Sequence, residues 1–417
     1  MWANKNLPDF GCLQGVRVVH QTGSTAGPFA VQLLADQGAD VVWLESSLIP
    51  DLTRMSKSWS LDAERRNQRG MGLNLPTPEG KEVLFKLLAD ADVYVENTKG
   101  NQYDKWGLTD EVLWQANPRL VICHVSGFGH DGLPEYVGRP SYDSIAQAFC
   151  GYINVNRNPQ TAPYAVGPYT VDFITALFAA YSIVTALYRV RETGKGESID
   201  VAQVEVAARA QQYQADWFTD KVEKEVTGNP SPYAGVGAFI CKDGAYIQLS
   251  LGGSAQVKKT CEFLSVPYGD EDIPAGAALV FRGGKGAEKV DGALIQYFAT
   301  KTAKEAETEM LAQGLAVNKV NTMEDFENDP QIQARGVLME WTNAKGATVR
   351  SVGPVPKFAN NPGRQWRAAP YWGQDNEEIL AELGYIPEQI EELYAKKILN
   401  HDPDLLFTMP YKIPGRA

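Results

Sequence analysis

The first part of the chain alternates short apolar runs with longer amphipathic ones. An apolar run at residues 16–21 is followed by a glycine-containing loop at 22–28, an amphipathic stretch at 29–39 and a second apolar run at 40–45. Short apolar runs predict buried strands, whereas apolar residues spaced three and four apart predict helices. We therefore predict a strand–helix–strand unit, with Pro28 in the first helical turn, where its missing N–H costs little.

The same rhythm continues. A helix is predicted at 77–91, opened by Thr77 as its cap, and is followed by a strand at 92–97. A further helix at 109–117 and a strand at 119–127 repeat the pattern. Strands that alternate with helices predict an α/β fold, in which a parallel sheet is covered by helices on both faces.

The residue pattern changes after Asp172, and it changes again near residue 225. A long, largely apolar helical stretch begins at Asp172 and continues to the first charged residue, Arg189. Residues 225–340 are rich in Gly, Pro and hairpin signals, which predict a second, smaller α+β domain. A Pro/Gly-rich connector and a terminal helix at 377–385 complete the predicted elements.

Composition narrows the class of protein. The chain has 417 residues, of which 44% are hydrophobic and 22% charged, as in ordinary globular proteins. Its longest apolar run, 173–188, is shorter than the roughly 20 residues of a spanning helix, and its start lacks signal-peptide features. Five scattered cysteines without a CxxC pair predict a cytoplasmic protein with reduced thiols. Four histidines argue against a His-rich metal site, and the net charge of −12 argues against nucleic acid.

The amino-terminal unit imitates a dinucleotide site only in part. A glycine loop follows the first strand and an acid, Glu45, ends the second, but the loop reads TGSTAGP instead of GxGxxG. Pro28 also stands where a phosphate would need an N–H. A basic cluster of Arg65, Arg66 and Arg69 is either an anion site or a solvated loop, and composition leaves both open.

Two further candidates are weaker. Cys123 and His124 are neighbours in a predicted strand, so their side chains point to opposite faces and cannot form a nucleophile–base pair. We therefore assign Cys123 to the core. Gly252 and Gly253 would let backbone N–H groups approach a ligand, as in a lid, although a lone pair of glycines favours a plain turn.

Asp172 has two interpretations. Aspartate is a favoured N-cap, and this one stands at the head of an apolar helical run. Alternatively, the positive end of the helix dipole keeps it ionised as a carboxylate nucleophile. The segment itself does not choose between these hypotheses.

Several stretches resemble the class III CoA-transferase family, named for formyl-CoA and carnitine CoA-transferases. They are GVRVVHQTGSTAGPFAVQLLADQGADVVWLES, RRNQRGMGLNLPTPEGKEVLFKLLADADVYVEN, NPRLVICHVSGFG, RPSYDSIAQAFCG, TGKGESIDVAQVEV and NNPGRQWRAAPYWGQDNEEIL. The resemblance runs from Gly11 to about Leu393 in one order. Within the family, LTDEVLWQANPRLVICHVSGFG and RETGKGESID are most similar to L-carnitine CoA-transferase.

The resemblance implies a Rossmann-like, CoA-binding large domain, begun by residues 1–224 and completed by a connector and return at 341–417. A small α+β domain at 225–340 lies between them. It also implies a homodimer of two interlocked chains. The family's catalytic aspartate matches Asp172, which favours the nucleophile interpretation.

The implied chemistry is transfer of CoA between small carboxylic acids through an aspartyl-CoA thioester on Asp172. Coenzyme A enters as acyl-CoA, a free acid is the acceptor, and no metal is required. The nearest branch suggests L-carnitine as acceptor, with gamma-butyrobetainyl-CoA or crotonobetainyl-CoA as donor. Exclusion of water protects such an activated ester from hydrolysis.

Family positions carry over to several residues of this chain. The predicted CoA contacts are Leu73, Asn97, Lys99 and Lys105, and the predicted substrate pocket contains Thr25, Tyr142, Gly252 and Gly253. Trp106 departs from a position that is often Arg or Met. The glycine-rich lid of the family is only partly present here.

Two other functions compete with transfer. An alpha-methylacyl-CoA racemase-like enzyme of the same fold would need a His–Asp pair where this chain has Tyr142–Asp143, and tyrosine, with an ordinary pKa of about 10, is a poor base at neutral pH. A non-catalytic acyl-CoA-binding subunit would keep the basic contacts without needing Asp172.

Overall fold

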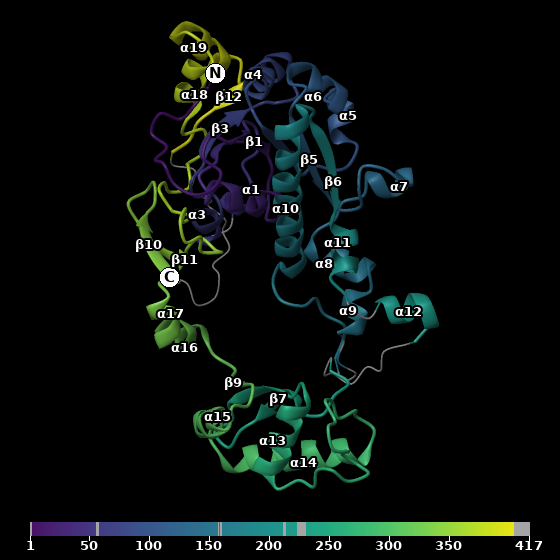
Figure 1. Ribbon diagram of the computed structural model, residues 1–417. Coiled ribbons are helices and arrows are strands. Elements are labelled where there is room, and N and C mark those ends of the chain that lie inside the picture. Colours follow the sequence, from purple (N-terminus) through teal and green to yellow (C-terminus); the bar gives the residue numbers. More distant parts are fainter. Residues whose placement is uncertain are drawn as a thin grey trace. The chain divides into compact units, whose positions relative to one another are not determined.

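The computed structural model describes residues 2–55, 58–156, 158, 161–211, 214–222 and 231–403. The chain divides into two compact units (Figure 1). The large unit comprises Met1–Asn154, Ala165–Glu223 and Gly336–Ala417, and the small unit comprises Val155–Tyr164 and Lys224–Arg335.

A seven-stranded sheet forms the centre of the large unit, in the order β12-β3-β2-β1-β4-β5-β6. Its strands are β1 (Arg17–Gln21), β2 (Asp40–Ser46), β3 (Arg69–Leu73), β4 (Val93–Glu96), β5 (Val121–Ser126), β6 (Glu197–Ala202) and β12 (Leu399–Asn400). All pairings are parallel except that between β12 and β3. The predicted α/β class is thereby confirmed. The strand order reverses between β1 and β4, and open sheets of this type bind ligands at the carboxyl ends of the strands beside such a point.

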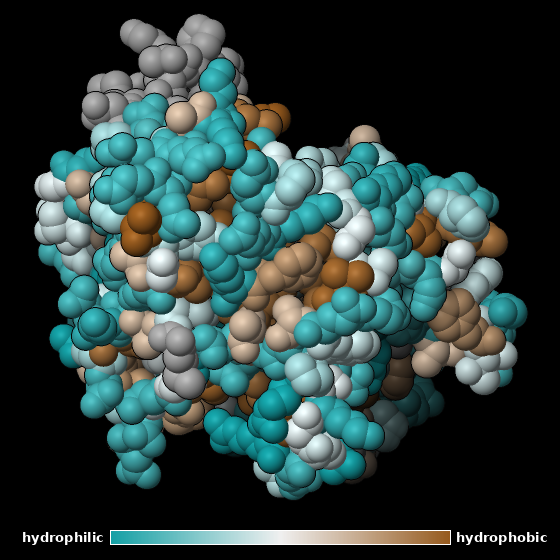
Figure 2. Space-filling model, turned by 90° about the horizontal axis from the view of Figure 1, so that it is seen from above, coloured by the Kyte–Doolittle hydropathy of each residue, from teal (hydrophilic) through white to brown (hydrophobic). Residues whose placement is uncertain are grey.

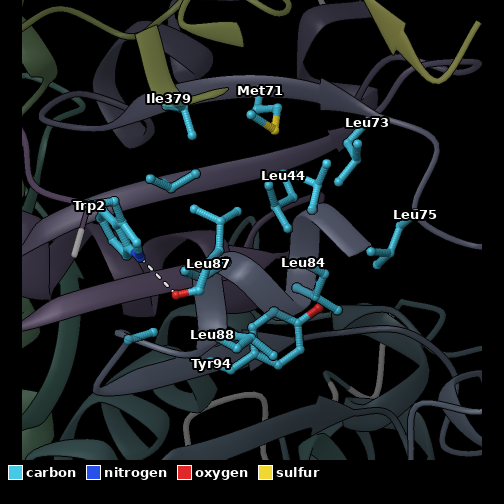
Figure 3. Packing of buried hydrophobic residues seen from close by; sticks show 14 of the residues in the cluster. Trp2, Leu44, Met71, Leu73, Leu75, Leu84, Leu87, Leu88, Tyr94 and Ile379 are labelled. Atoms are coloured by element: carbon cyan, nitrogen blue, oxygen red, sulfur yellow. Dashed lines mark hydrogen bonds between the residues drawn. The ribbon is translucent and has the colours of Figure 1, made fainter. Parts of the chain in front are cut away.

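Helices cover both faces of this sheet. On one face lie α1 (Ala26–Ala35) and α10 (Thr170–Thr193), which share a core with Val18, Val41, Val95 and Cys123. On the other lie α4 (Pro78–Leu88), α6 (Asp110–Ala116), α18 (Asn376–Glu382) and α19 (Pro387–Ala395). Alternate strand residues feed the two cores, as the pleat requires. The second core contains Trp2, Leu44, Met71, Leu84 and Tyr94 (Figure 3).

Local chemistry explains where the predicted helices begin. Thr77 caps α4, because its hydroxyl accepts a hydrogen bond from the backbone N of Gly80 at 3.1 Å, and Pro78 follows as the first helical residue. Pro28 lies in the first turn of α1, as predicted. Trp2 adds a tertiary restraint, since its indole Nε1 donates to the carbonyl oxygen of Leu87 at 2.7 Å (Figure 3).

Shorter elements complete the large unit. They are α2 (Leu52–Met55), α3 (Ser60–Glu64), α5 (Gln102–Trp106), α7 (Pro134–Val137), α8 (Asp143–Phe149), α9 (Tyr152–Val155, which ends at the boundary), α11 (Gln203–Arg209), α12 (Gln214–Asp220), β10 (Leu338–Thr342) and β11 (Thr348–Val352). Strands β10 and β11 form an antiparallel hairpin.

The small unit has a three-stranded antiparallel sheet in the order β7-β8-β9. Its elements are β7 (Val236–Ile240), β8 (Tyr246–Ser250), β9 (Val317–Lys319), α13 (Ser254–Leu264), α14 (Lys285–Thr300), α15 (Ala303–Ala312), α16 (Met323–Asn328) and α17 (Pro330–Ala334). One core unites Ile247 and Leu249 of the sheet with Leu294 and Phe298 of α14. The hairpin that the sequence predicts is formed by β7 and β8.

Helix α10 has 24 residues and is longer than its apolar run 173–188, because it extends to Thr170 at one end and Thr193 at the other. Among the described residues it is the one helix whose length and composition would allow it to cross a bilayer. One side of α10 packs against α1, β5 and β6, as core helices do.

The opposite side of α10 carries a stripe of exposed apolar side chains: Leu177, Phe178, Tyr181, Val184 and Tyr188. Their spacing of three and four residues keeps them on one face of the helix. The face of the molecule seen in Figure 2 is mainly hydrophilic, with hydrophobic residues in small separate groups. The stripe on α10 places five exposed apolar side chains along one helix, so it needs an explanation.

Candidate functional site

A cavity of about 320 Å³ opens at the carboxyl ends of β1, β4 and β5, where the strand order reverses. It is lined by Gly23, Ser24, Thr25, Ala26, Asn97, Thr98, Lys99, Val125, Ser126, Gly127, Arg139, Pro140, Ser141, Tyr142, Asp172 and Gln203. All of these residues belong to the large unit. The cavity thus brings together five of the predicted site residues: Thr25, Asn97, Lys99, Tyr142 and Asp172.

Asp172 lies inside the first turn of α10 and does not cap it. The helix starts after Tyr169, which has a left-handed backbone and makes no side-chain cap. The cap comes from α8 instead, because Asp143 Oδ1 accepts the backbone N–H groups of Val171 at 2.7 Å and Asp172 at 3.2 Å. The helix-cap interpretation of Asp172 is therefore wrong, because its carboxylate does not accept the N–H groups at the start of α10.

The environment of Asp172 disfavours its charge. Burial and then the nearby Asp143 carboxylate raise its pKa, a hydrogen bond from Gln203 Nε2 to Oδ1 opposes them, and the pKa lies at about 7. The predicted effect of the helix dipole does not keep this carboxylate at an ordinary acidic pKa. A buried carboxyl group that titrates near neutrality inside a cavity is typical of functional sites.

The loop after β1 is held in a rare conformation. Ser24 has φ = 62°, a left-handed value that non-glycine residues seldom adopt. Its N–H donates to Asp51 Oδ2 at 2.9 Å and its carbonyl accepts from Arg65 Nη2 at 2.6 Å. Asn97 clamps Gly23, accepting its N–H at 2.9 Å and donating to its carbonyl at 2.8 Å. These contacts give the loop one shape at the cavity wall.

Two basic side chains line the cavity. Lys99 was predicted, whereas Arg139 was missed, although it stands three residues before Tyr142 in the motif RPSYDSIAQAFCG. The Arg139 guanidinium lies over the rings of Phe128 at 5.0 Å and Tyr136 at 5.7 Å. Within the described part of the chain, neither cation forms an ion pair.

Sequence reasoning also overlooked Gln203 and Asp143 as parts of the site. Gln203 begins α11, and only the folded chain brings it to Asp172. Asp143 entered the sequence argument only as the half of a racemase-like pair that this chain keeps, beside Tyr142 in place of the histidine. No local signal marks either side chain, because both act through contacts across about 30 positions of sequence.

Two predicted CoA contacts lie outside the cavity. Leu73 ends β3, is buried, and pairs with Leu399 of β12, so its side chain serves the core. Lys105 lies on α5, where Nζ donates to Asn101 Oδ1 at 3.0 Å. Gly252 and Gly253 belong to the small unit, between β8 and α13, and Gly253 adopts φ = 91°.

The basic cluster is neither a solvated loop nor an exposed anion site. Arg65 is fully buried, and its Nη2 lies 3.6 Å from Asp51 Oδ1. Arg66 pairs with Asp36 at 2.6 Å, and Arg69 pairs with Glu382 at 2.9 Å. These guanidinium groups are therefore used inside the protein, where buried charges need partners.

A larger cavity of about 520 Å³ also lies in the large unit. Trp59, Tyr371 and Trp372 contribute to its wall, and Arg54 there is already paired with Glu45 at 2.9 Å. It contains none of the predicted site residues. We therefore place the chemistry in the smaller cavity, whose wall holds Asp172 with its strongly raised pKa.

One group in the described residues has the spacing of a metal site. Ligand atoms of Glu96, His124 and His130 lie within 4.8 Å of one another. However, His124 Nδ1 lies 2.8 Å from Glu96 Oε1, and Nε2 lies 2.9 Å from Asp110 Oδ1. An imidazole between two carboxylates donates from both nitrogens, which leaves it no lone pair for a metal.

Comparison with known proteins assigns the chain to a family. The chain matches the model of CoA-transferase family III over residues 13–376. The chain belongs to this family. The CoA-transferase is 38% identical over 413 residues to the bile acid CoA-transferase BaiK of Clostridium scindens, covering 98% of this chain and 93% of that relative.

Solved structures agree with the fold of the CoA-transferase. A CAIB/BAIF family protein from Brucella suis superposes with a TM-score of 0.75 at 27% identity, covering 90% of this chain and 100% of that one. Rv3272 from Mycobacterium tuberculosis gives 0.76 at 23% identity, covering 88% and 98%, a likeness of fold alone. The protein is thus a class III CoA-transferase, and the family implies CoA as co-substrate.

The raised pKa of Asp172 has a consequence for stability. With a folded pKa above its unfolded value of about 4, the group makes the folded state less stable as the pH rises from about 4 to about 7. Asp172→Asn removes this charge but keeps an oxygen for Gln203. We expect the variant to melt at least about 2 °C above wild type at pH 8, with the difference vanishing near pH 4, in thermal unfolding followed by circular dichroism.

The control is Glu82→Gln, which removes an exposed acid paired with Lys86 on α4. Its melting temperature should stay close to wild type because exposed pairs contribute little. An Asp172→Asn variant that melts at or below wild type at pH 8 would show that burial does not oppose this charge.

Proposed function

We propose that Asp172 is the nucleophile of CoA transfer between carboxylic acids. Its carboxylate attacks the acyl-CoA carbonyl and forms a mixed anhydride with release of CoA thiolate. The thiolate then attacks the aspartyl carbonyl, releasing the first acid and leaving an aspartyl-CoA thioester. The acceptor acid reverses both steps, so the thioester bond is conserved.

The observation that carries this proposal is the state of Asp172. Its carboxyl group lies in the cavity wall, is free of any ion pair with the described residues, and has a pKa of about 7. A carboxylate that is poorly stabilised by its surroundings is a better nucleophile than a solvated one. The side-chain amide of Gln203 donates a hydrogen bond to this carboxylate and fixes its orientation.

The other cavity residues suit the charges of this reaction. Lys99 and Arg139, which form no ion pair with the residues that the structure describes, offer cations for the thiolate or the phosphates of CoA. The first turn of α1 begins at Ala26 in the cavity wall, and the N–H groups of a helix start stabilise negative charge. Thr25 and Tyr142 complete the acyl pocket, while Leu73 and Lys105 remain predicted contacts for parts of CoA beyond the cavity.

A racemase-like function fits the structure less well. Asp143 would have to act in proton abstraction, but Oδ1 accepts the Val171 and Asp172 N–H groups and Oδ2 accepts Gln147 Nε2 at 2.7 Å. A carboxylate so occupied is a structural acceptor. Its neighbour Tyr142 is no substitute for the histidine base.

The nucleophile can be trapped. Donor acyl-CoA plus hydroxylamine, without acceptor acid, should convert Asp172 to a hydroxamate that peptide mass spectrometry locates. Asp172→Ala should lose both label and transfer while CoA affinity stays within a few-fold, because the group acts in chemistry more than in binding.

The matched control for trapping is Glu205→Gln, which removes an exposed acid on α11 near Gln203. It should retain labelling. A label on Asp143 or Glu205 would contradict the assignment, and transfer by Asp172→Ala would make the chain a transferase with another nucleophile. CoA binding without transfer in wild type would favour the non-catalytic subunit.

We propose a small acid such as L-carnitine as the acceptor, with gamma-butyrobetainyl-CoA or crotonobetainyl-CoA as donor. Two motifs of the sequence support this choice, and a cavity of about 320 Å³ is at the low end for ligand sites. A bile acid is the competing acceptor, because it is the substrate class named for the relative BaiK.

Rates with matched acids will separate these acceptors. Carnitine has a trimethylammonium group that Tyr142, exposed in the cavity wall, can attract through its ring. Replacing this group by neutral tert-butyl keeps the shape and forfeits roughly 0.5–2 kcal/mol, so carnitine should exceed the isostere several-fold in kcat/KM. Equal rates, or faster transfer to a bile acid such as cholate, would contradict the carnitine proposal.

We further propose that two chains form the interlocked homodimer that the family resemblance implies. The exposed apolar stripe of α10 supports it, since a self-association surface would cover such side chains. Light scattering on a sizing column should give twice the 45.8 kDa of one chain. Tyr181→Asp should lower the dimer fraction and Ile386→Asp, an exposed control on another surface, should not. A monomeric wild type would contradict the proposal.

A further inference from the structure

Glu96, the last residue of β4, is fully buried directly before the cavity-lining residues 97–99. Both of its carboxylate oxygens are occupied. Oε2 accepts hydrogen bonds from the backbone N of Thr98 at 2.7 Å and from its hydroxyl at 2.6 Å. Oε1 faces His124 Nδ1 at 2.8 Å and His130 Nε2 at 3.3 Å.

The position of His124 follows from the sheet. It is the register partner of Glu96 across the parallel pair β4–β5, so both side chains project on the same face. Burial opposes its charge, but hydrogen bonds to Asp110 and Glu96 raise the pKa of His124 to about 10. Glu96 in turn, although buried, is held by the two histidines and Thr98 at a pKa of about 2. The pair is ionised throughout the neutral range.

We infer that Glu96 and His124 are positioning residues for CoA transfer, which hold the segment 97–99 in the shape that binds CoA. This inference rests on the proposed function. Neither side chain lines the cavity, and their effect reaches it through Thr98 and Lys99. The pair fixes the backbone from which the Lys99 side chain extends into the cavity wall.

The same contacts also reach the loop after β1, which forms another part of the cavity wall. Asn97 is joined to Gly23 by two hydrogen bonds, and Gly23 precedes the strained Ser24 and the start of α1. One continuous set of contacts therefore runs from Asp110 through His124 and Glu96 to both loops of the cavity. A change in Glu96 should move both walls together, which a single contact with CoA would not do.

Glu96→Gln is the direct test, because Gln offers one acceptor where Glu offers two. Its oxygen cannot accept from Thr98 and His124 at once, so either Thr98 loses its acceptor or His124 gives up the Nδ1 proton, and with it the charge, to accept from the new amide. We expect KM for acyl-CoA to rise about tenfold or more while kcat changes less than about threefold. Amide exchange at Thr98 and Gly23 should accelerate in the same variant.

The double variant Glu96→Gln/His124→Gln supplies a rescue. There the amide oxygen introduced at position 96 can accept from Thr98, while the NH₂ of the same amide donates to the amide oxygen introduced at position 124. We expect the double variant to bring KM most of the way back from the raised value of Glu96→Gln toward that of wild type, a non-additive result that marks a coupled pair. Should Glu96→Gln fail to fold, the milder Asp110→Asn should raise KM in the same direction.

Asp36→Asn is the matched control, because Asp36 is also a buried acid paired with a basic side chain of the large unit, here Arg66. It should lower the melting temperature and leave KM unchanged. An active enzyme whose KM and Thr98 exchange do not respond to Glu96→Gln would overturn the inference and leave CoA transfer intact. An inactive wild type would contradict the proposed function, and with it the role in transfer, while exchange at Thr98 would still show whether Glu96 holds the segment.

Discussion

The site depends on one hydrogen-bonded contact, the acceptance of the first N–H groups of α10 by Asp143. A helix start needs acceptors for its unpaired N–H groups, and an acid in the first turn commonly supplies them. Here the acceptor is delivered from α8, so the acid of the helix itself remains available. The same neighbour adds a negative charge that raises the pKa of Asp172. The start of α10 and the raised pKa of Asp172 thus both depend on the neighbouring Asp143 carboxylate.

Around Asp143 and Asp172, the loops of the cavity wall are held by charged side chains that do not themselves line the cavity. Arg65 and Glu96 are buried and Asp51 is partly buried, and each holds the backbone of a loop. Buried charges contribute little net stability, and their value lies in fixing one geometry among several. The cations left over, Lys99 and Arg139, are those on the cavity surface. Whether a charged side chain holds a loop or lines the cavity therefore depends on its position in the fold, which composition could not reveal.

The sequence predicted the elements better than it predicted the contacts. The alternation of strands and helices, the Thr77 cap and Pro28 follow from local preference, which the backbone obeys wherever packing agrees. The cavity wall could be found through Asp172, Thr25, Asn97, Lys99 and Tyr142, but only by resemblance to a family. Gln203, Asp143 and Arg139 escaped, because the pairing of β5 with β6 and the packing of α8 on α10 decide their positions. The cluster of Arg65, Arg66 and Arg69 was misinterpreted for the same reason, because acidic partners such as Asp36 and Glu382 lie far from it in the sequence.

The edge of the main sheet has a consequence for biosynthesis. Strand β12 pairs with β3 across more than 320 positions, and the small unit is inserted between the segments that supply them. Until residues 376–400 leave the ribosome, β3 has an unpaired edge and its apolar core lacks α18 and α19. Unpaired edges of this kind invite association with other chains. The nascent chain therefore passes through a long interval in which the edge of β3 is open to association with other chains.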